Sequence, residues 1–587
     1  MNFTRRDAWV AGALTALLLA LLLPVASIGV DQHHDASMLK PALDVLSGQV
    51  LFRDSFMQYG AMSCYLQVLA LWVQPTLLSI RLLTVAAYAL TLLTLYAAWR
   101  LILPRPLAAG AGLFFILFIP VYDQEYWNHE YWLLLPWSSV YAMLFQGLGV
   151  YALFRVVRGE RPEAWSVVLG VATSCVFWFR QPVGVMMLGS LMVIAPALHW
   201  AGWVPVAGSK RAVFVRVLGG LALVHALMFG GMAVTGALPA WWYQNIVWPA
   251  KWSQGVDWMD TLPFSIHPIA AAIMGALVLV VAIPVAVRRV RPGWSGVFLP
   301  VYGLALGALL FWQREEVCNA LAVSEGGWAL VIPLVILGQA GLSIRQMVAG
   351  PVTGRTEEYY MVSALAALGL GSLVQYYPMA DAWHIFYSLA PVFGLFVFSL
   401  WRWSGWPASR AAVGLIVLLL PAGYHRIRSI SPALNRSLVT LNAPAVLRGM
   451  KVTPDQALTV AQVDATLGLI MRYRPDIPGA LIGDSALYLC LLNNKENPTP
   501  YYVTWRGLAT QADNLQRWAY IARVRPVMIL HGARWQAVDD FYKRSHYVPL
   551  LYVPPERLEI AVPQELADRM ALKAYGLFGI RRPNAQP

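Results

Sequence analysis

Two carboxylates and two imidazoles stand close together near the start of the chain: Asp31, His33, His34 and Asp35. They follow an apolar run, residues 8–30, that is long enough to cross a bilayer. A carboxylate in such a place can act as a general base and take a proton from a hydroxyl group. Histidine and carboxylate side chains also bind several divalent metals, so a metal site remains a second interpretation. We therefore expect acid–base chemistry where the first helix leaves the membrane.

Further polar side chains occur in later loops, and several of them could bind an anion or support a base. Cations stabilise a leaving phosphate through charge-assisted hydrogen bonds. Arg180 ends an apolar segment, where an arginine is costly unless it binds an anion or an acid. The candidates for binding an anion are Arg180, Arg314 and His384. The candidates that would contact an acceptor or support the base are His34, Arg53, Asp54, Glu125, Glu130 and Asp381.

The composition places these residues in a membrane protein. Of the 587 residues, 58% are hydrophobic and only 12% are charged, whereas about 25% are charged in a typical soluble domain. Thirteen segments approach the length of a span: 8–30, 82–100, 106–121, 132–154, 164–179, 183–201, 214–236, 266–287, 295–312, 327–343, 360–376, 385–402 and 410–424. We interpret the first as a retained signal anchor, because no convincing small-residue cleavage site follows it. The four cysteines stand far apart, which predicts neither a metal box nor a disulfide framework.

The distribution of charge predicts how these segments are oriented. The net charge of +13 comes from Lys and Arg that gather in alternate short loops, for example Arg155 with Arg158 and Arg288 with Arg289. Positively charged loops stay in the cytoplasm, so the N-terminus is expected there and nucleic acid is not an expected partner. The candidate acids and histidines fall in the opposite loops. We therefore place the chemistry on the outer face of the cytoplasmic membrane.

Two short helices are expected in the first outer loop, lying in the interface rather than crossing it. They correspond to "ASMLKPALDVLSG" and "FMQYGAMSCYLQVLALWV". Asp35 stands at the start of the first, whereas Asp31 is still tied to the spanning helix, so Asp35 is the preferred base and Asp31 the alternative.

The chain changes character after about residue 424. "GALIGDSALYLCLLNN" predicts a strand, a turn and a helix, while "RVRPVMIL" and "YVPLLYV" predict short strands. The expected organisation is a mainly α membrane domain over residues 1–424 and a small α/β domain over residues 425–587 on the outer face.

The first loop resembles that of the GT-C superfamily, whose members are integral membrane glycosyltransferases that use lipid-linked sugars. Relatives include protein O-mannosyltransferases, the lipid A aminoarabinose transferase and mycobacterial arabinofuranosyltransferases. The resemblance rests on four features in order: an acid after the first helix, an interfacial helix, an Arg-Asp turn and a Tyr-Gly pair. In addition, "YYPMADAWHIFYSLAP" is similar to a late outer loop of the group. The matching first-loop residues are Asp35, Gly48, Phe52, Arg53, Asp54, Tyr59 and Gly60. Many relatives have Asp-Glu where this chain has His34-Asp35, which leaves the choice between Asp35 and Asp31 open.

The resemblance implies an inverting transfer of a sugar from a polyprenyl-phosphate carrier to an envelope glycan, lipid or protein. It also implies membrane lipids as partners and a reaction without a covalent sugar–enzyme intermediate. No cofactor is required by the sequence, although a divalent metal remains an option. The alternatives are a transporter of lipid-linked glycans and a non-catalytic subunit of envelope assembly. A transporter should have polar residues at mid-membrane depth, and almost none are found there.

Overall fold

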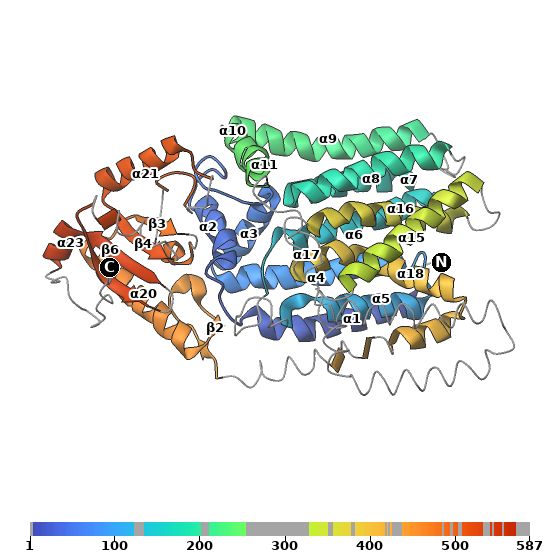
Figure 1. Cartoon of the computed structure of the whole chain (residues 1–587), viewed down its shortest axis with the longest axis horizontal. Helices are drawn as coiled ribbons and strands as arrows, with labels where there is room; N and C mark the ends of the chain where they lie inside the picture. The colour runs from blue at the N-terminus through green and yellow to red at the C-terminus, as the bar shows by residue number, and fades with distance from the viewer. Residues whose placement is uncertain are drawn as a thin grey trace.

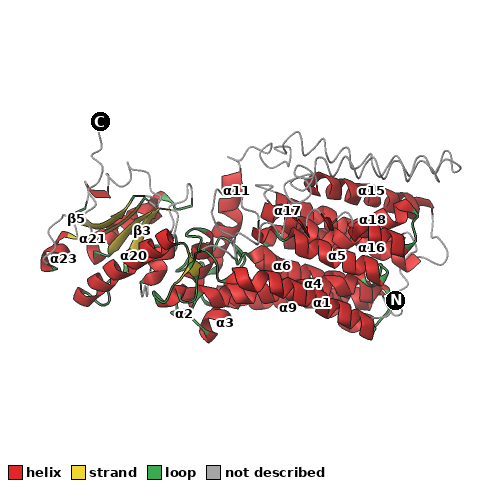
Figure 2. Ribbon diagram, turned by 90° about the horizontal axis from the view of Figure 1, so that it is seen from below, coloured by secondary structure: helices red, strands yellow, loops and turns green. Residues whose placement is uncertain are grey.

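The computed structural model of the chain is a helix bundle with a smaller mixed domain at one end (Figure 1). The structure describes residues 4–122, 134–200, 210–253, 328–349, 356–376, 382–416, 419–420, 423–424, 437–483, 486–492, 497–502, 508–531, 541–542, 545–554 and 557–570. The N-terminus lies at the end of the bundle that is remote from the strands, as Figures 1 and 2 both show. The mainly helical bundle and the small C-terminal α/β region expected from the sequence are thus confirmed.

The described part of the bundle consists mainly of long helices. The helices are α1 (Arg5–Ala26), α4 (Leu77–Trp99), α5 (Arg105–Phe118), α6 (Ser138–Val157), α7 (Pro162–Phe179), α8 (Gln181–Trp200), α9 (Lys210–Val234), α15 (Trp328–Ala349), α16 (Thr356–Ser372), and the short helix α17 (Ala382–Leu389) followed by α18 (Phe393–Ser404). Helix α6 packs against α4 and α7, and α7 packs against α9. Within the described ranges, six helical segments are long and apolar enough to cross a membrane.

Most predicted spans coincide with helices of the bundle. The predicted segment 8–30 is α1, 132–154 is α6 and 385–402 is α17 with α18. The predicted spans 266–287 and 295–312 lie outside the described residues, so the total of thirteen stays a prediction. The chain is a multi-pass membrane protein.

A capping box begins α1 at the end of the bundle that holds the N-terminus. The Thr4 hydroxyl accepts from the backbone of Asp7, and the Asp7 carboxylate accepts from the backbone of Thr4. Asp7 is fully buried and pairs with Arg100 at 2.7 Å and Arg105 at 2.8 Å. The ion pairs therefore fasten α1 to the segment that joins α4 to α5.

Two short helices follow α1 at the other end of the bundle. They are α2 (His34–Leu46) and α3 (Ala61–Val73). Helix α3 presents Leu69, Trp72 and Val73 to the exterior, 60%, 78% and 81% exposed, as expected for a helix in the interface. Helix α2 differs from that expectation, because protein encloses it and even Lys40 and Asp44 are buried.

The C-terminal domain is built on a four-stranded sheet with the order β3-β4-β6-β5. Strand β3 (Gly479–Gly483) runs parallel to β4 (Val527–His531), and β6 (Leu558–Pro563) is antiparallel to both β4 and β5 (Tyr547–Val553). The strands predicted from sequence at β3, β4 and β5 are confirmed. The domain also contains α20 (Pro454–Tyr473), α21 (Gln511–Val524), α23 (Gln564–Arg569), the 3-10 helix η10 (Leu487–Leu491) and the pair β1 (Val439–Thr440) and β2 (Lys451–Val452).

A single hydrophobic core joins the first loop to the C-terminal domain. Val30, Met38 and Phe52 from the first loop belong to the same buried cluster as Val452 and Tyr488. The expected boundary near residue 425 falls in residues 425–436, which lie outside the described ranges. The first loop and the C-terminal domain therefore pack as one body although almost 400 residues separate them in sequence.

Candidate active site

Asp31 lies in the turn between α1 and α2, and its carboxylate is bound by the turn itself. Oδ1 accepts the backbone N–H of His33 at 2.9 Å, accepts the backbone N–H of His34, and faces the His34 Nδ1 at 3.1 Å. The Asp31 side chain is 9% exposed to solvent. Burial alone would raise the pKa of Asp31, but the hydrogen bonds from His34 outweigh it and hold the pKa below the ordinary value. The Asp31 carboxylate is thus ionised, and its hydrogen bonds fix its orientation.

Asp35, the base preferred on sequence grounds, has a different environment. It is fully buried and pairs with the equally buried Arg81 of α4, whose Nη2 lies 2.5 Å from Oδ2. Oδ2 also accepts the backbone N–H of Asp31 at 2.8 Å. A general base must come within hydrogen-bond reach of the proton it abstracts, so this enclosure argues against Asp35 in that role. Its contacts instead hold the turn that carries Asp31.

Arg81 is a residue of the site that the sequence reasoning missed. Besides Asp35, it donates from Nη1 to the carbonyl of Ile28 at 2.8 Å. One guanidinium therefore ties α4 to the end of α1 and to the start of α2. The signal was present in the sequence, because an arginine among apolar residues at a membrane helix requires a partner.

A cluster of imidazole and indole rings lies next to this turn. The ring of His34 is 4.8 Å from that of His33 and 5.2 Å from that of Trp137, which precedes α6. The Trp137 ring is in turn 5.5 Å from His384 of α17 and 6.0 Å from Trp383. Folding thus brings His34 and His384, predicted separately from two loops, to the same indole. Trp137 had not been singled out from the sequence.

Arg180 lies at the junction of α7 and α8, on the same side of the bundle. Its guanidinium stands 5.5 Å from the centre of the Tyr59 ring in the first loop. Arg180 occupies the end of α7 with an extended backbone, because α8 starts at the next residue. A guanidinium beside an aromatic ring keeps its donors available for an anion.

The Arg53–Asp54 pair is exposed and belongs to the turn between α2 and α3. Its charged atoms are 2.8 Å apart, and Arg53 also donates to the carbonyl of Thr235 at 3.0 Å. The Arg53 guanidinium lowers the pKa of Asp54. These contacts shape the loop and connect it to the end of α9.

Four of the expected site residues lie outside the described residues: Arg314, Glu125, Glu130 and Asp381. Their roles stay predictions.

The metal interpretation is tested by the residues of the turn itself. Among the described residues, no three His, Cys, Asp or Glu side chains come together in a way that could hold a metal ion. Of the four expected donors, Asp35 is bound to Arg81 and Asp31 to the backbone of the turn. The described turn does not fit a resident metal, and the chemistry below uses none.

Gly60 controls how closely the first loop approaches Arg180. Its N–H donates to the carbonyl of Phe179 at 3.2 Å. A Cβ at this position would lie 2.0 Å from the carbonyl oxygen of Trp178, which is backbone and cannot rotate away. The start of α3 can therefore reach the α7–α8 junction only with a glycine at this position.

Gly60→Ala is expected to lower the free energy of unfolding by about 1–3 kcal/mol, because the added methyl forces a backbone shift. Thermal unfolding of the purified protein in detergent measures the effect. Gly189→Ala on α8 is the matched control, since nothing lies within 4 Å of its added Cβ. Equal unfolding temperatures for the two variants would contradict the close approach.

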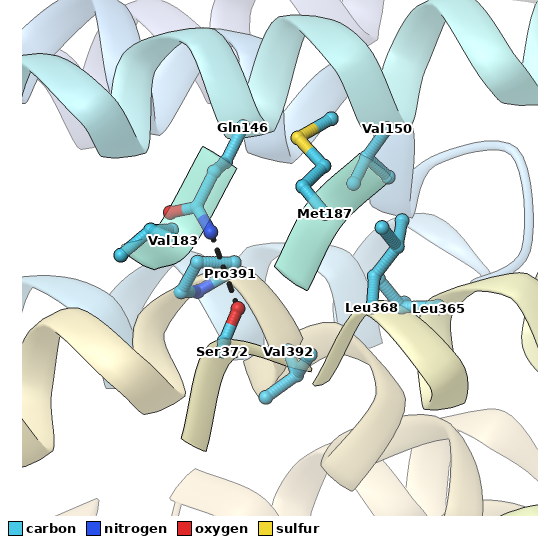
Figure 3. A pocket seen from close by; sticks show the side chains of 9 residues that line it. All are labelled: Gln146, Val150, Val183, Met187, Leu365, Leu368, Ser372, Pro391 and Val392. Atoms are coloured by element: carbon cyan, nitrogen blue, oxygen red, sulfur yellow. Dashed lines mark hydrogen bonds between the residues drawn. The ribbon is translucent and has the colours of Figure 1, made fainter. Parts of the chain in front are cut away.

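A separate pocket lies within the bundle between α6, α8, α16 and η8 (Ala390–Val392), as Figure 3 shows. Gln146 and Ser372 face one another across it, with Gln146 Nε2 donating to the Ser372 hydroxyl at 3.2 Å. The remaining lining is apolar: Val150, Val183, Met187, Leu365, Leu368, Pro391 and Val392.

The chain resembles solved structures in its fold, but its sequence matches no family model and no curated protein. The oligosaccharyltransferase of Archaeoglobus fulgidus, solved with zinc and sulfate, superposes over 95% of this chain and 73% of its own, with TM-score 0.50 and 12% identity. The chain therefore shares the overall fold of this oligosaccharyltransferase.

Two further structures are similar over most of the chain. The Archaeoglobus fulgidus enzyme AglB with an inhibitory peptide and a dolichol-phosphate covers 96% of this chain and 74% of its own, at 11% identity and TM-score 0.49. ArnT from Cupriavidus metallidurans bound to undecaprenyl phosphate covers 95% and 99%, at 11% identity and TM-score 0.43. The resemblance expected from the first loop agrees with the fold shared with the first of these structures, and the reaction must be argued from the residues of the site.

Proposed function

We propose that the protein transfers a sugar from a polyprenyl-phosphate carrier to an envelope glycan, lipid or protein on the outer face of the cytoplasmic membrane. The observation that carries this proposal is the Asp31 turn. It holds an ionised carboxylate where α1 leaves the bundle, beside the rings of His34, Trp137 and His384. A lipid phosphate stays at the membrane surface and a polar acceptor cannot enter the bilayer, so this depth is where the two reactants meet.

Asp31 is the residue best suited to act as the base. Its carboxylate takes the proton of the acceptor hydroxyl as the acceptor oxygen forms a bond to the anomeric carbon. In the same step the bond from that carbon to the phosphate oxygen breaks, and its electron pair leaves with the polyprenyl phosphate. Attack opposite the leaving group inverts the anomeric carbon, and no covalent sugar–enzyme intermediate is needed.

The leaving phosphate requires positive charge or hydrogen-bond donors at the same depth. Arg180 and His384 supply these in the proposal, since both face the outer loops near Tyr59 and Trp137. Arg314 is a third candidate on sequence grounds alone. The basic loops that alternate along the membrane domain support a cytoplasmic N-terminus and an outer C-terminal domain, and with that orientation the proposed site is on the outer face.

The donor class is tested by binding of undecaprenyl phosphate to the purified protein in lipid nanodiscs, followed by native mass spectrometry. Arg180→Ala is expected to weaken binding by about 10- to 150-fold, the equivalent of one charge-assisted contact of roughly 1.5–3 kcal/mol. Arg180→Lys should restore only part of it, because a point charge does not reproduce the guanidinium fork.

Arg158→Ala serves as the control, since Arg158 follows α6 at the opposite end of the bundle and pairs with Glu160. It should bind undecaprenyl phosphate like the wild type. The proposal is contradicted if the wild type binds no undecaprenyl phosphate. If Arg180→Ala binds as tightly as the wild type, the phosphate lies elsewhere.

A further inference from the structure

The segment that carries Asp31 is bound by the C-terminal domain along its backbone. The N–H of Gly29 donates to the carbonyl of Lys451 at 2.8 Å, and the N–H of Lys451 donates to the carbonyl of Ser27 at 2.6 Å. Residues 27–29 thus pair with β2 like a short strand. The Gln456 side chain of α20 adds a third bond, from Nε2 to the carbonyl of Val30 at 2.8 Å. The last of these acceptors belongs to the residue directly before Asp31.

A fourth contact reaches the residue directly after Asp31. The Gln32 side chain donates to the hydroxyl of Tyr488 in η10 at 3.1 Å. Tyr488 is fully buried, so this hydroxyl is held by the core of the C-terminal domain. Asp31 is therefore flanked on both sides by residues whose positions the C-terminal domain sets, while Arg81 and Asp35 hold the turn from the bundle.

The C-terminal domain is itself docked on the first loop through a buried polar network. Lys40 of α2 donates to Asp44 and, at 2.9 Å, to the Asn497 side-chain oxygen. Asn497 Nδ2 donates to Asp44 at 3.0 Å and to the carbonyl of Asp54 at 3.0 Å. Buried ionic groups require partners of fixed geometry, so this network keeps the domain in one position on α2.

We propose that the C-terminal domain positions the base, with Gln456 and Tyr488 as positioning residues for Asp31. The inference rests on the proposed function. The first loop and the C-terminal domain are then two halves of one catalytic unit: the loop supplies the carboxylate, and the domain sets the place and direction of that carboxylate relative to the sugar. Because displacement of a reacting group by about 1 Å costs on the order of 100-fold in rate, side chains that touch no substrate can control transfer.

The test uses two substitutions in the full-length protein in lipid nanodiscs. Tyr488→Phe removes only the hydroxyl that accepts from Gln32, and Gln456→Leu removes the donor to Val30 at similar volume. Gln462→Leu makes the same change six residues further along α20 and is the control. Three quantities are measured: hydrogen–deuterium exchange of residues 27–36, binding of undecaprenyl phosphate, and the pH dependence of single-turnover cleavage of undecaprenyl-phosphate mannose, arabinofuranose and aminoarabinose.

In both variants we expect faster exchange of residues 27–36 and cleavage about 10- to 100-fold slower, with unchanged binding of undecaprenyl phosphate. The acid limb of the rate should move to higher pH. The reason is that a looser turn presents the His34 donors less well, so the pKa of Asp31 returns toward its ordinary value. Gln462→Leu should match the wild type in all three.

The inference is overturned if exchange in residues 27–36 stays at the wild-type rate in both variants. It is overturned equally if exchange rises while the rate and the pH profile do not change. Failure of the proposed function has a different signature, because Asp31→Asn would then cleave the donor like the wild type. Should Gln456→Leu not fold, Tyr488→Phe decides, since loss of one hydroxyl leaves the packing intact.

Discussion

Asp31→Asn is expected to abolish sugar transfer while leaving the fold and the binding of undecaprenyl phosphate intact. An asparagine side-chain oxygen can still accept the backbone N–H groups of His33 and His34 that the carboxylate accepts in the wild type. An amide cannot take a proton, however, and loss of a general base typically costs about 10²–10⁴ in rate. Single-turnover cleavage of undecaprenyl-phosphate sugars in nanodiscs measures the effect.

Two comparisons make this result specific. Asp455→Asn replaces an exposed carboxylate in the first turn of α20 and should retain the wild-type rate.

The pH dependence of the transfer rate provides the other comparison. Because the His34 hydrogen bonds lower the pKa of Asp31, the carboxylate stays ionised as the pH falls below the ordinary value of 3.8, and only further acidification protonates it. A wild-type rate in Asp31→Asn would place the base elsewhere.

Asp35→Asn is expected to destabilise the protein strongly rather than to remove a base. The substitution leaves the Arg81 guanidinium charged and fully buried without its carboxylate. Removal of one partner of a buried ion pair typically costs about 3–5 kcal/mol. Thermal unfolding monitored by size-exclusion chromatography should therefore show a marked loss of folded protein.

The double variant separates this charge effect from other consequences of the substitution. Asp35→Asn combined with Arg81→Met removes both charges, while the asparagine oxygen can still accept the Asp31 N–H, and it should be more stable than either single variant. The exposed pair offers a control: Asp54→Asn should change stability little, because solvent screens its interaction with Arg53. If Asp35→Asn unfolds like the wild type yet transfers no sugar, Asp35 regains the role of base.

Several features of the site could be predicted from the sequence because they depend on local pattern. Long apolar runs predict the helices of the bundle, and the acids and histidines between them predict which end of the bundle holds the chemistry. His34 and His384 were singled out from two loops some 350 residues apart, and the structure places their rings 5.2 Å and 5.5 Å from the ring of Trp137. The strands β3, β4 and β5 likewise follow from short apolar runs bounded by turn residues.

The proposal of Asp31 rather than Asp35 as the base rests on a difference that only the tertiary structure reveals. The two residues have the same chemistry and stand four positions apart, so local pattern cannot rank them. What separates them is Arg81 on α4, which pairs with the fully buried Asp35, whereas the Asp31 side chain is 9% exposed and is bound by the backbone of the turn.

The dependence of the site on the C-terminal domain was equally hidden from the sequence. Lys451, Gln456 and Tyr488 lie more than 400 residues from Asp31. Lys451 meets the segment before Asp31 through its backbone N–H and carbonyl, and Gln456 and Tyr488 each contribute one side-chain group. The sequence alone determined that this is a helical membrane protein with acids and imidazoles gathered where its first helix ends. Which carboxylate is fully buried in an ion pair, and what holds the other, was set by packing between distant segments, because burial and hydrogen-bond partners arise only when those segments meet.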